Sequence, residues 1–231
     1  MKMAGIIGGI APESTIEYYR GIIARYRQQK PDGTYPPLVI NSIDLTHMIG
    51  MIGAGDLDGV TGYLTAEVTR LAAAGAAFAV FASNTPHIVF DRIAARTPIP
   101  MLSIVEATRD AVSRTNITRL ALFGTRFTMQ GGFYRTAFAA RGLTVVLPTE
   151  EEQAWIHDKY MNELVAGTFL PATKDRLTSI LARMRRDHAI EAVILGGTEL
   201  PLILREPEYD GVRVFDTTAI HVERIVEEIV G

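Results

Sequence analysis

The chain of 231 residues contains no cysteine. This absence excludes disulfide bonds, metal sites built from thiolates and any catalytic thiol, so the stability of the folded chain has to come from its core. The five histidines are scattered and show no pair four residues apart, which is the spacing of a zinc site on a helix. We therefore expect no metal site.

An excess of one sign of charge is also lacking. Lysine and arginine together number 23 and aspartate and glutamate 26, which gives a net charge of −3. Proteins that bind nucleic acid carry a basic patch, and proteins held on an anionic membrane carry a polybasic run, and neither feature is present. We expect a small neutral or anionic molecule as the partner, and neither nucleic acid nor a membrane.

Long hydrophobic runs are missing as well. The longest, residues 72–82, is interrupted by Gly75 and is well short of the ~20 apolar residues that cross a bilayer. The opening segment 3–9 is typical of a strand followed by a turn, and does not have the charged and then apolar order of a secretory leader. These features predict a cytoplasmic protein.

The chain does contain a regular alternation of apolar, strand-length segments with helical patterns. The segments are continuous and rich in Val, Ile and Leu, which favours parallel strands buried on both faces. They are residues 3–8, 37–41, 77–82, 100–102, 120–124, 143–147, 189–195 and 212–215. The clearest helix between them starts at an N-cap, Asp56, continues as an apolar stripe and should stop near Gly75. Another amphipathic helix is predicted for residues 217–230.

Alternating strands and helices of this kind predict an α/β fold with a doubly wound parallel sheet. Two strand-turn segments of the first half, residues 6–15 and 79–83, are echoed at nearly the same offset by residues 120–129 and 193–197. We therefore expect two pseudo-symmetric lobes, one formed by residues 1–103 with 212–231 and the other by residues 104–211. Because ligands of open α/β sheets bind beyond the carboxyl ends of the strands, the expected site is a cleft between the lobes.

Each turn at a strand end also has a plainer interpretation. Gly8 and Gly9 could hold a phosphate at a helix start, but the run lacks the spacing of a dinucleotide-binding loop. Gly196 and Gly197 could form a tight turn without any chemistry. The residues from Ser83 onward could cap the helix that follows, and they lack the surrounding glycines of a serine hydrolase.

Seven segments together resemble the aspartate/glutamate racemase superfamily, and its aspartate racemase branch in particular. The first segment, 8–19, combines a glycine pair with Pro-Glu-Ser-Thr and two tyrosines. The others are residues 41–44, 81–87, 124–129, 156–167, 195–200 and 216–221. They occur in the family's order and at its spacing, and they cover nearly the whole chain.

The resemblance implies a racemase-like isomerase that needs no cofactor and acts on an amino acid or a related carboxylate, and it also implies a homodimer. In the superfamily one cysteine removes the α-proton and a second, on the opposite face, supplies one. The positions of these cysteines are Ser83 and Gly197 in this chain. Since neither residue has a thiol, the usual two-thiol mechanism is not possible, and the candidates for proton transfer are Glu199, His87, and Ser83 acting through a water molecule.

The residues expected to bind the substrate are better preserved than the catalytic pair. In the family, positions of this kind surround the substrate carboxylate with hydroxyl, amide and backbone donors. The resemblance assigns this role to Ser14, Asn84, Thr85, Thr125, Thr128 and Thr198. The side-chain end of the pocket is expected to be apolar, because residues 164–167 carry no lysine, and strict specificity for aspartate or glutamate is therefore not expected.

Three hypotheses on function follow from the sequence. The first is an enzyme of the family with altered acid and base groups. The second is a carboxylate-binding homologue that does not racemise its ligand. The third is a chain in which the catalytic cysteines were replaced by engineering, with Ser83 and Gly197 as the replacements.

Overall fold

The computed structural model describes residues 1–231 and divides them into two compact units. The first unit comprises Met1–Ile104 and His221–Gly231, and the second comprises Val105–Ile220. The first boundary lies within one residue of the expected one. The second differs from the expected position, 211/212, because the strand at Val212–Asp216 pairs with Ala192–Gly196 in the sheet of the second unit.

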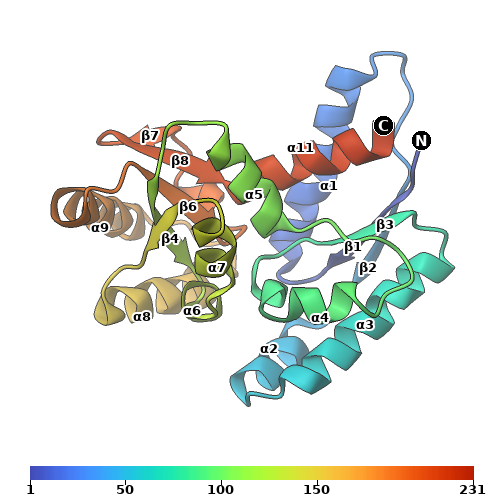
Figure 1. Cartoon of the computed structure of the whole chain (residues 1–231), viewed down its shortest axis with the longest axis horizontal. Coiled ribbons are helices and arrows are strands. Elements are labelled where there is room, and N and C mark those ends of the chain that lie inside the picture. The colour runs from blue at the N-terminus through green and yellow to red at the C-terminus, as the bar shows by residue number, and fades with distance from the viewer. The chain divides into compact units, whose positions relative to one another are not determined.

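The first unit is built around a three-stranded parallel sheet with strand order β2-β1-β3 (Figure 1). Its elements are β1 (Ala4–Gly8), α1 (Pro12–Gln29), β2 (Leu38–Ser42), α2 (Leu45–Gly53), α3 (Leu57–Ala73), β3 (Phe78–Phe81), the 3-10 turn η1 (Thr85–Val89), α4 (Phe90–Ala94) and the greater part of α11 (Thr217–Val230). The helix α5 (Ile104–Ser113) follows and leads into the second unit.

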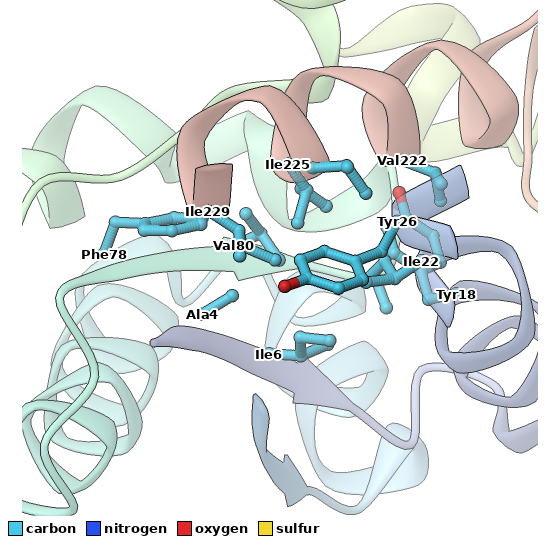
Figure 2. Packing of buried hydrophobic residues seen from close by; sticks show 12 residues of the cluster. Ala4, Ile6, Tyr18, Ile22, Tyr26, Phe78, Val80, Val222, Ile225 and Ile229 are labelled. Atoms are coloured by element: carbon cyan, nitrogen blue, oxygen red, sulfur yellow. The ribbon is translucent and has the colours of Figure 1, made fainter. Parts of the chain in front are cut away.

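Helices cover both faces of this sheet. On one face, Ile6 of β1 and Val80 of β3 pack against α1 and α11, and Figure 2 shows Tyr26 and Ile225 of these helices directed toward the strands. On the other face, a β-carbon at Gly5 would lie 3.0 Å from a methyl group of Leu71 in α3, so only glycine lets the helix approach this closely. The expected doubly wound arrangement is therefore present in this unit.

The second unit contains a five-stranded sheet with strand order β5-β4-β6-β8-β7, in which only β7 runs antiparallel. Its elements are β4 (Arg119–Gly124), α6 (Arg126–Gln130), α7 (Phe133–Ala139), β5 (Thr144–Val146), α8 (Glu150–Lys159), the π-helix η2 (Tyr160–Leu164), α9 (Pro171–His188), β6 (Ala192–Gly196), α10 (Leu200–Ile203), β7 (Glu208–Tyr209) and β8 (Val212–Asp216). The register pairs Gly124 with Gly196, so the segments that follow β4 and β6 begin side by side.

The helix starts and stops predicted from local sequence are confirmed. Asp56 caps α3 by accepting a hydrogen bond of 2.8 Å from the amide of Gly59. Gly75, two residues beyond the end of α3, has a φ of +92°, which glycine adopts without strain. The predicted helix 217–230 has the bounds of α11.

Two short segments differ from the expectation. Residues 100–102 make only an isolated bridge between Met101 and Ala79, because Pro100 has no amide hydrogen to donate and α5 begins at Ile104. The two-residue strand β7 was not expected, and a strand this short has no period that sequence could reveal. None of the helices is long and apolar enough to span a bilayer.

Candidate active site

The end of β4 presents two buried threonines. Thr125 follows the strand and caps α6, where its hydroxyl accepts a hydrogen bond from the amide of Thr128. The hydroxyl oxygens of Thr125 and Thr128 are 3.1 Å apart. Both side chains are buried, so these hydroxyls are held in fixed positions at the strand end.

The neighbouring end of β6 lies directly against these threonines. A β-carbon at Gly124 would be 3.1 Å from Cβ of Thr128, and one at Gly196 would be 3.1 Å from its Cγ2. Glycine at both positions therefore lets Thr128 pack onto the ends of two adjacent strands. The segment Gly197, Thr198 and Glu199 continues from this point, as the register of β4 and β6 predicts.

Glu199 is the centre of a buried polar cluster. Its Oε2 accepts a hydrogen bond of 3.0 Å from the hydroxyl of Thr198 and a second one from the phenol of Tyr160. Glu199 and Thr198 are almost completely buried, and Tyr160 is 6% exposed. Burial and the negative charge of Glu199 hold the pKa of Tyr160 well above its usual range, so the phenol keeps its proton at neutral pH.

The backbone around Tyr160 is a π-helix. It continues α8, whose first turn is fixed by a capping box between Thr149 and Glu152. The amide of Val165 bonds to the carbonyl of Tyr160, which is the wider spacing of a π-turn. Single π-turns inserted in helices often occur at functional sites, and here the turn carries the tyrosine that contacts Glu199.

A β-carbon at Gly197 would meet the ring of Tyr160. It would lie 2.9 Å from both Cζ and the phenol oxygen of that side chain, closer than real β-carbons approach other atoms. The phenol thus occupies the space into which any side chain at position 197 would extend. Glycine at position 197 is therefore required by the close packing of Tyr160 and not only by the backbone turn.

In the first unit, the end of β3 carries Ser83, Asn84 and Thr85, all of which are buried. The first turn of α1 is tied to this strand end, because the hydroxyl of Ser14 lies 3.0 Å from the carbonyl oxygen of Ala82 and 2.8 Å from that of Ala11. The structure therefore brings Ser14 and the segment from Ser83 to Thr85 together.

His87 is engaged through both ring nitrogens. Nδ1 lies 3.2 Å from the carbonyl oxygen of Asn84, and Nε2 accepts a hydrogen bond of 3.3 Å from the amide of Ile104. The ring stacks on Phe90 with 4.8 Å between centroids. Burial, together with the nearby His221, lowers the pKa of His87 to about 3, so the ring is neutral at physiological pH.

A second buried histidine was not singled out by the sequence. His221 is fully buried, and its Nδ1 accepts a hydrogen bond of 2.8 Å from the hydroxyl of Tyr18, while Nε2 donates to the carbonyl oxygen of Leu102. Burial lowers its pKa to about 3 as well. The local sequence separates it from His188, which follows Arg185-Arg186-Asp187 and is exposed, whereas His221 lies on the predicted amphipathic helix 217–230. Its complete burial depends on α11 covering the sheet.

The family model described as Asp/Glu/hydantoin racemase matches residues 7–225. The chain belongs to this racemase family. The resemblance in the sequence is thereby confirmed, together with the α/β fold of two parallel-sheet units.

Solved structures of similar proteins extend the racemase-family match over the whole chain. A candidate Asp/Glu racemase from Yersinia pestis is 30% identical, and the match covers all of both chains with a TM-score of 0.90. An aspartate racemase homologue from Pyrococcus horikoshii OT3 is 34% identical, again over all of both chains, with a TM-score of 0.86. An aspartate racemase from Picrophilus torridus shares the fold, with 18% identity, a TM-score of 0.74 and coverage of 98% of this chain and 95% of the other.

Tyr160 is the residue of this racemase-family chain that sequence reasoning missed. Its position in the chain gives no sign of a contact with residues 197–199, because it lies on a different helical segment. The one available signal was the loss of a side chain at Gly197, which leaves room for a large side chain from elsewhere. Which side chain takes that room is decided by the packing of η2 against the end of β6.

We expect the substitution Ser14→Ala to lower the free energy of unfolding by about 1–2 kcal/mol, because it removes a buried hydrogen bond and leaves a carbonyl without its donor. Urea unfolding would measure this loss. Ser113→Ala is the matched control, since that hydroxyl also bonds to a carbonyl but is exposed, and its effect should stay within about 0.5 kcal/mol. Equal losses in both variants would contradict the structural role of Ser14.

Proposed function

We propose that this chain is a racemase-like enzyme that works without a cofactor and transfers a proton at the α-carbon of an amino acid or a related small carboxylate. The observation that carries the proposal is the set of buried hydroxyls at two adjacent strand ends, those of Thr125, Thr128 and Thr198. Buried hydroxyl groups at the ends of parallel strands are suited to bind a carboxylate, because ligands of such sheets bind beyond these strand ends.

We assign recognition of a substrate carboxylate to buried polar residues, described for each unit by itself. In the second unit these are Thr125, Thr128 and Thr198. In the first unit the residues assigned to this role are Ser14, Asn84 and Thr85. Their burial supports the assignment, because donors that are held in place before binding lose little conformational entropy when a ligand arrives.

The proton-transfer groups have to differ from the usual thiols, since Ser83 and Gly197 stand at both cysteine positions. We propose Glu199, or Ser83 acting through a water molecule, as such a group. The contacts of His87 support a positioning role for this residue, because both of its ring nitrogens already bond to the backbone and its pKa of about 3 keeps it neutral.

The second candidate function is binding of a carboxylate without turnover. It is favoured by one observation, namely that neither Ser83 nor Gly197 can titrate near neutral pH. The third hypothesis, replacement of the cysteines by engineering, has less support. Because Tyr160 fills the space beside Gly197, these two residues fit each other, and a cysteine at 197 would not fit this tyrosine.

The test is incubation in deuterium oxide with proteinogenic amino acids of both hands and a set of small 2-substituted carboxylic acids. The enzyme proposal expects deuterium at the α-position of at least one compound. Mass spectrometry or NMR would measure this exchange. The binding proposal expects no exchange but a stabilisation of about 2.7 kcal/mol at a ligand concentration of about 100 times Kd. No exchange and no thermal shift with any compound would remove both.

Recognition by the hydroxyls can be tested on the compound that gives the largest response. We expect Thr128→Val, which keeps the shape of the side chain but removes its hydroxyl, to weaken binding roughly tenfold, the value of one hydrogen bond of about 1.4 kcal/mol. Thr69→Val changes an exposed threonine in the same way and should leave Kd within twofold. Unchanged affinity in Thr128→Val would show that this hydroxyl does not contact the ligand.

We further propose a homodimer in the cytoplasm. The family membership supports the dimer, and the lack of a membrane-spanning helix is compatible with the location. Sedimentation equilibrium of the purified chain would give the mass of the particle, and a monomer at micromolar concentration would refute the dimer. Fractionation of the native cells tests the location.

A further inference from the structure

The structure contains a buried pair, Tyr160 and Glu199, that the usual chemistry of the family does not use. The phenol of Tyr160 lies where a side chain at position 197 would extend, since a β-carbon at position 197 would be 2.9 Å from the phenol oxygen. The missing side chain is thereby replaced in space by a different acidic group, which arrives from η2 and not from the strand end itself.

The pair is buried and hydrogen-bonded, which fixes the positions of its polar atoms. Tyr160, Thr198 and Glu199 are all buried, and both hydroxyls donate to the same carboxylate oxygen, Oε2 of Glu199. Burying a carboxylate costs several kcal/mol unless its hydrogen bonds are satisfied. A cluster that served only to fill space would be cheaper with apolar side chains of the same size.

We infer that Tyr160 is a catalytic residue that exchanges a proton with the substrate α-carbon on the side of Gly197. Glu199 accepts the phenol proton of Tyr160 in one direction and returns it in the other. This inference rests on the proposed function, because it supplies the proton-transfer group which that function requires. It assigns to Glu199 an indirect role, through the tyrosine, and to Thr198 the positioning of the carboxylate.

The step balances without any co-reactant. In one direction, the bond between the α-carbon and its hydrogen breaks, the proton moves to the phenol oxygen of Tyr160, and the phenol proton moves to Oε2 of Glu199. The electron pair that remains on the α-carbon is delocalised into the substrate carboxylate. In the reverse direction, the phenol gives its proton to the α-carbon and recovers one from the protonated Glu199.

The electrostatics of the pair fit this relay. Burial and the charge of Glu199 keep the pKa of Tyr160 well above its usual range, so a free phenolate is not formed at neutral pH. The tyrosine therefore cannot act as an independent base. Tyr160 can act as a relay: its phenol proton moves to Glu199 while the phenol oxygen accepts the α-proton of the substrate.

The test uses the full chain and the compound that shows the fastest α-deuterium exchange. Tyr160→Phe keeps the ring and removes only the hydroxyl, and we expect the exchange rate to fall at least 100-fold while KM changes less than threefold. Glu199→Gln should cause a loss of similar size, and the double variant should be no slower than the slower single variant, because the two groups act as one unit.

The matched control is Tyr134→Phe. Tyr134 is equally buried in the same unit, but its hydroxyl bonds to Thr108 and Thr217 and not to Glu199. We expect its exchange rate to stay within threefold of the unmodified chain. If Tyr160→Phe also stays within threefold, the role of Tyr160 is overturned while the proposed function stands. If the unmodified chain exchanges no compound, both are overturned.

A second variant covers the case in which Tyr160→Phe does not fold. Incorporation of 3,5-difluorotyrosine at position 160 keeps the ring and the hydroxyl but makes the phenol more acidic. The inference expects the pH profile of the exchange rate to shift toward lower pH, whereas a residue that only fills space would leave the profile unchanged. An unchanged profile overturns the inference.

Discussion

Acidification from pH 7 to pH 5 is expected to lower the free energy of unfolding by roughly 4 kcal/mol, through two histidines that are buried without charge. His87 and His221 both have a pKa of about 3 in the folded chain, against an ordinary value of 6.5. Below pH 6.5 the unfolded chain takes up a proton at each of them and the folded chain does not. Each histidine therefore costs about 1.4 kcal/mol for every pH unit below 6.5, or about 2 kcal/mol at pH 5.

The loss should continue as the pH falls toward 3, where the folded chain also becomes protonated at these sites. Carboxylates contribute in a different window. The pKa of Glu152, Glu191 and Glu228 is lowered in the folded chain, so the stability that they supply is lost only as the pH falls below about 4.5. A decline that is already clear between pH 6.5 and pH 5 is thus specific to the histidines.

Urea unfolding at pH 7 and pH 5 measures the effect. His221→Gln keeps an acceptor for Tyr18 and a donor for Leu102, and we expect it to reduce the pH-dependent loss to about half. His188→Gln changes an exposed histidine and should leave the loss as it is. Equal stability of the unmodified chain at the two pH values would contradict the neutral state of both buried rings.

Restoring the family's cysteine at position 197 is expected to destabilise the chain by about 1–3 kcal/mol. The reason is the ring of Tyr160, whose Cζ would lie 2.9 Å from the new β-carbon, and which is held in place by its hydrogen bond to Glu199. The ring cannot give way without breaking a buried polar contact. Gly197→Cys therefore overpacks the site, although cysteine is the residue that the sequence resemblance implies at this position.

A double-mutant cycle separates this clash from other effects of the substitution. Combining Gly197→Cys with Tyr160→Leu should cost at least 1 kcal/mol less than the sum of the two single variants, because the smaller side chain leaves room for the cysteine. Gly62→Cys is the control. A β-carbon at this exposed helical position meets no atom within 4 Å, and the variant should be as stable as the unmodified chain or slightly more so. Additive single and double variants would show that Tyr160 does not occupy the space beside Gly197.

If the α-deuterium exchange of the variants agrees with the proposed role of Tyr160, the chain combines the fold of its family with different proton-transfer groups. Gly197 has no side chain at the end of β6, and the ring of Tyr160 from η2 occupies the space beside it. The buried hydroxyls at the ends of β4 and β6 would still recognise a carboxylate, while protons would move through a phenol and not through a thiol. If the chain binds a carboxylate without turnover, Tyr160 only fills the space beside Gly197.

Features that depend on neighbouring residues could be predicted from the sequence alone. The order of strands and helices, the cap at Asp56, the stop at Gly75 and the bounds of α11 all follow from local patterns, because periodicity, capping and backbone freedom act over a few residues. The family also followed from the sequence, since its turns at the strand ends carry recognisable residues at fixed spacing.

Only the tertiary structure decided which side chains from distant parts of the chain meet. The assignment of β8 to the second unit, the burial of His87 and His221 without charge, and the contact of Tyr160 with residues 197 and 199 all depend on how complete elements pack. The physical reason is that packing fills space without regard to chain order. A gap left by a missing side chain at Gly197 is visible in the sequence, but the group that fills it is not.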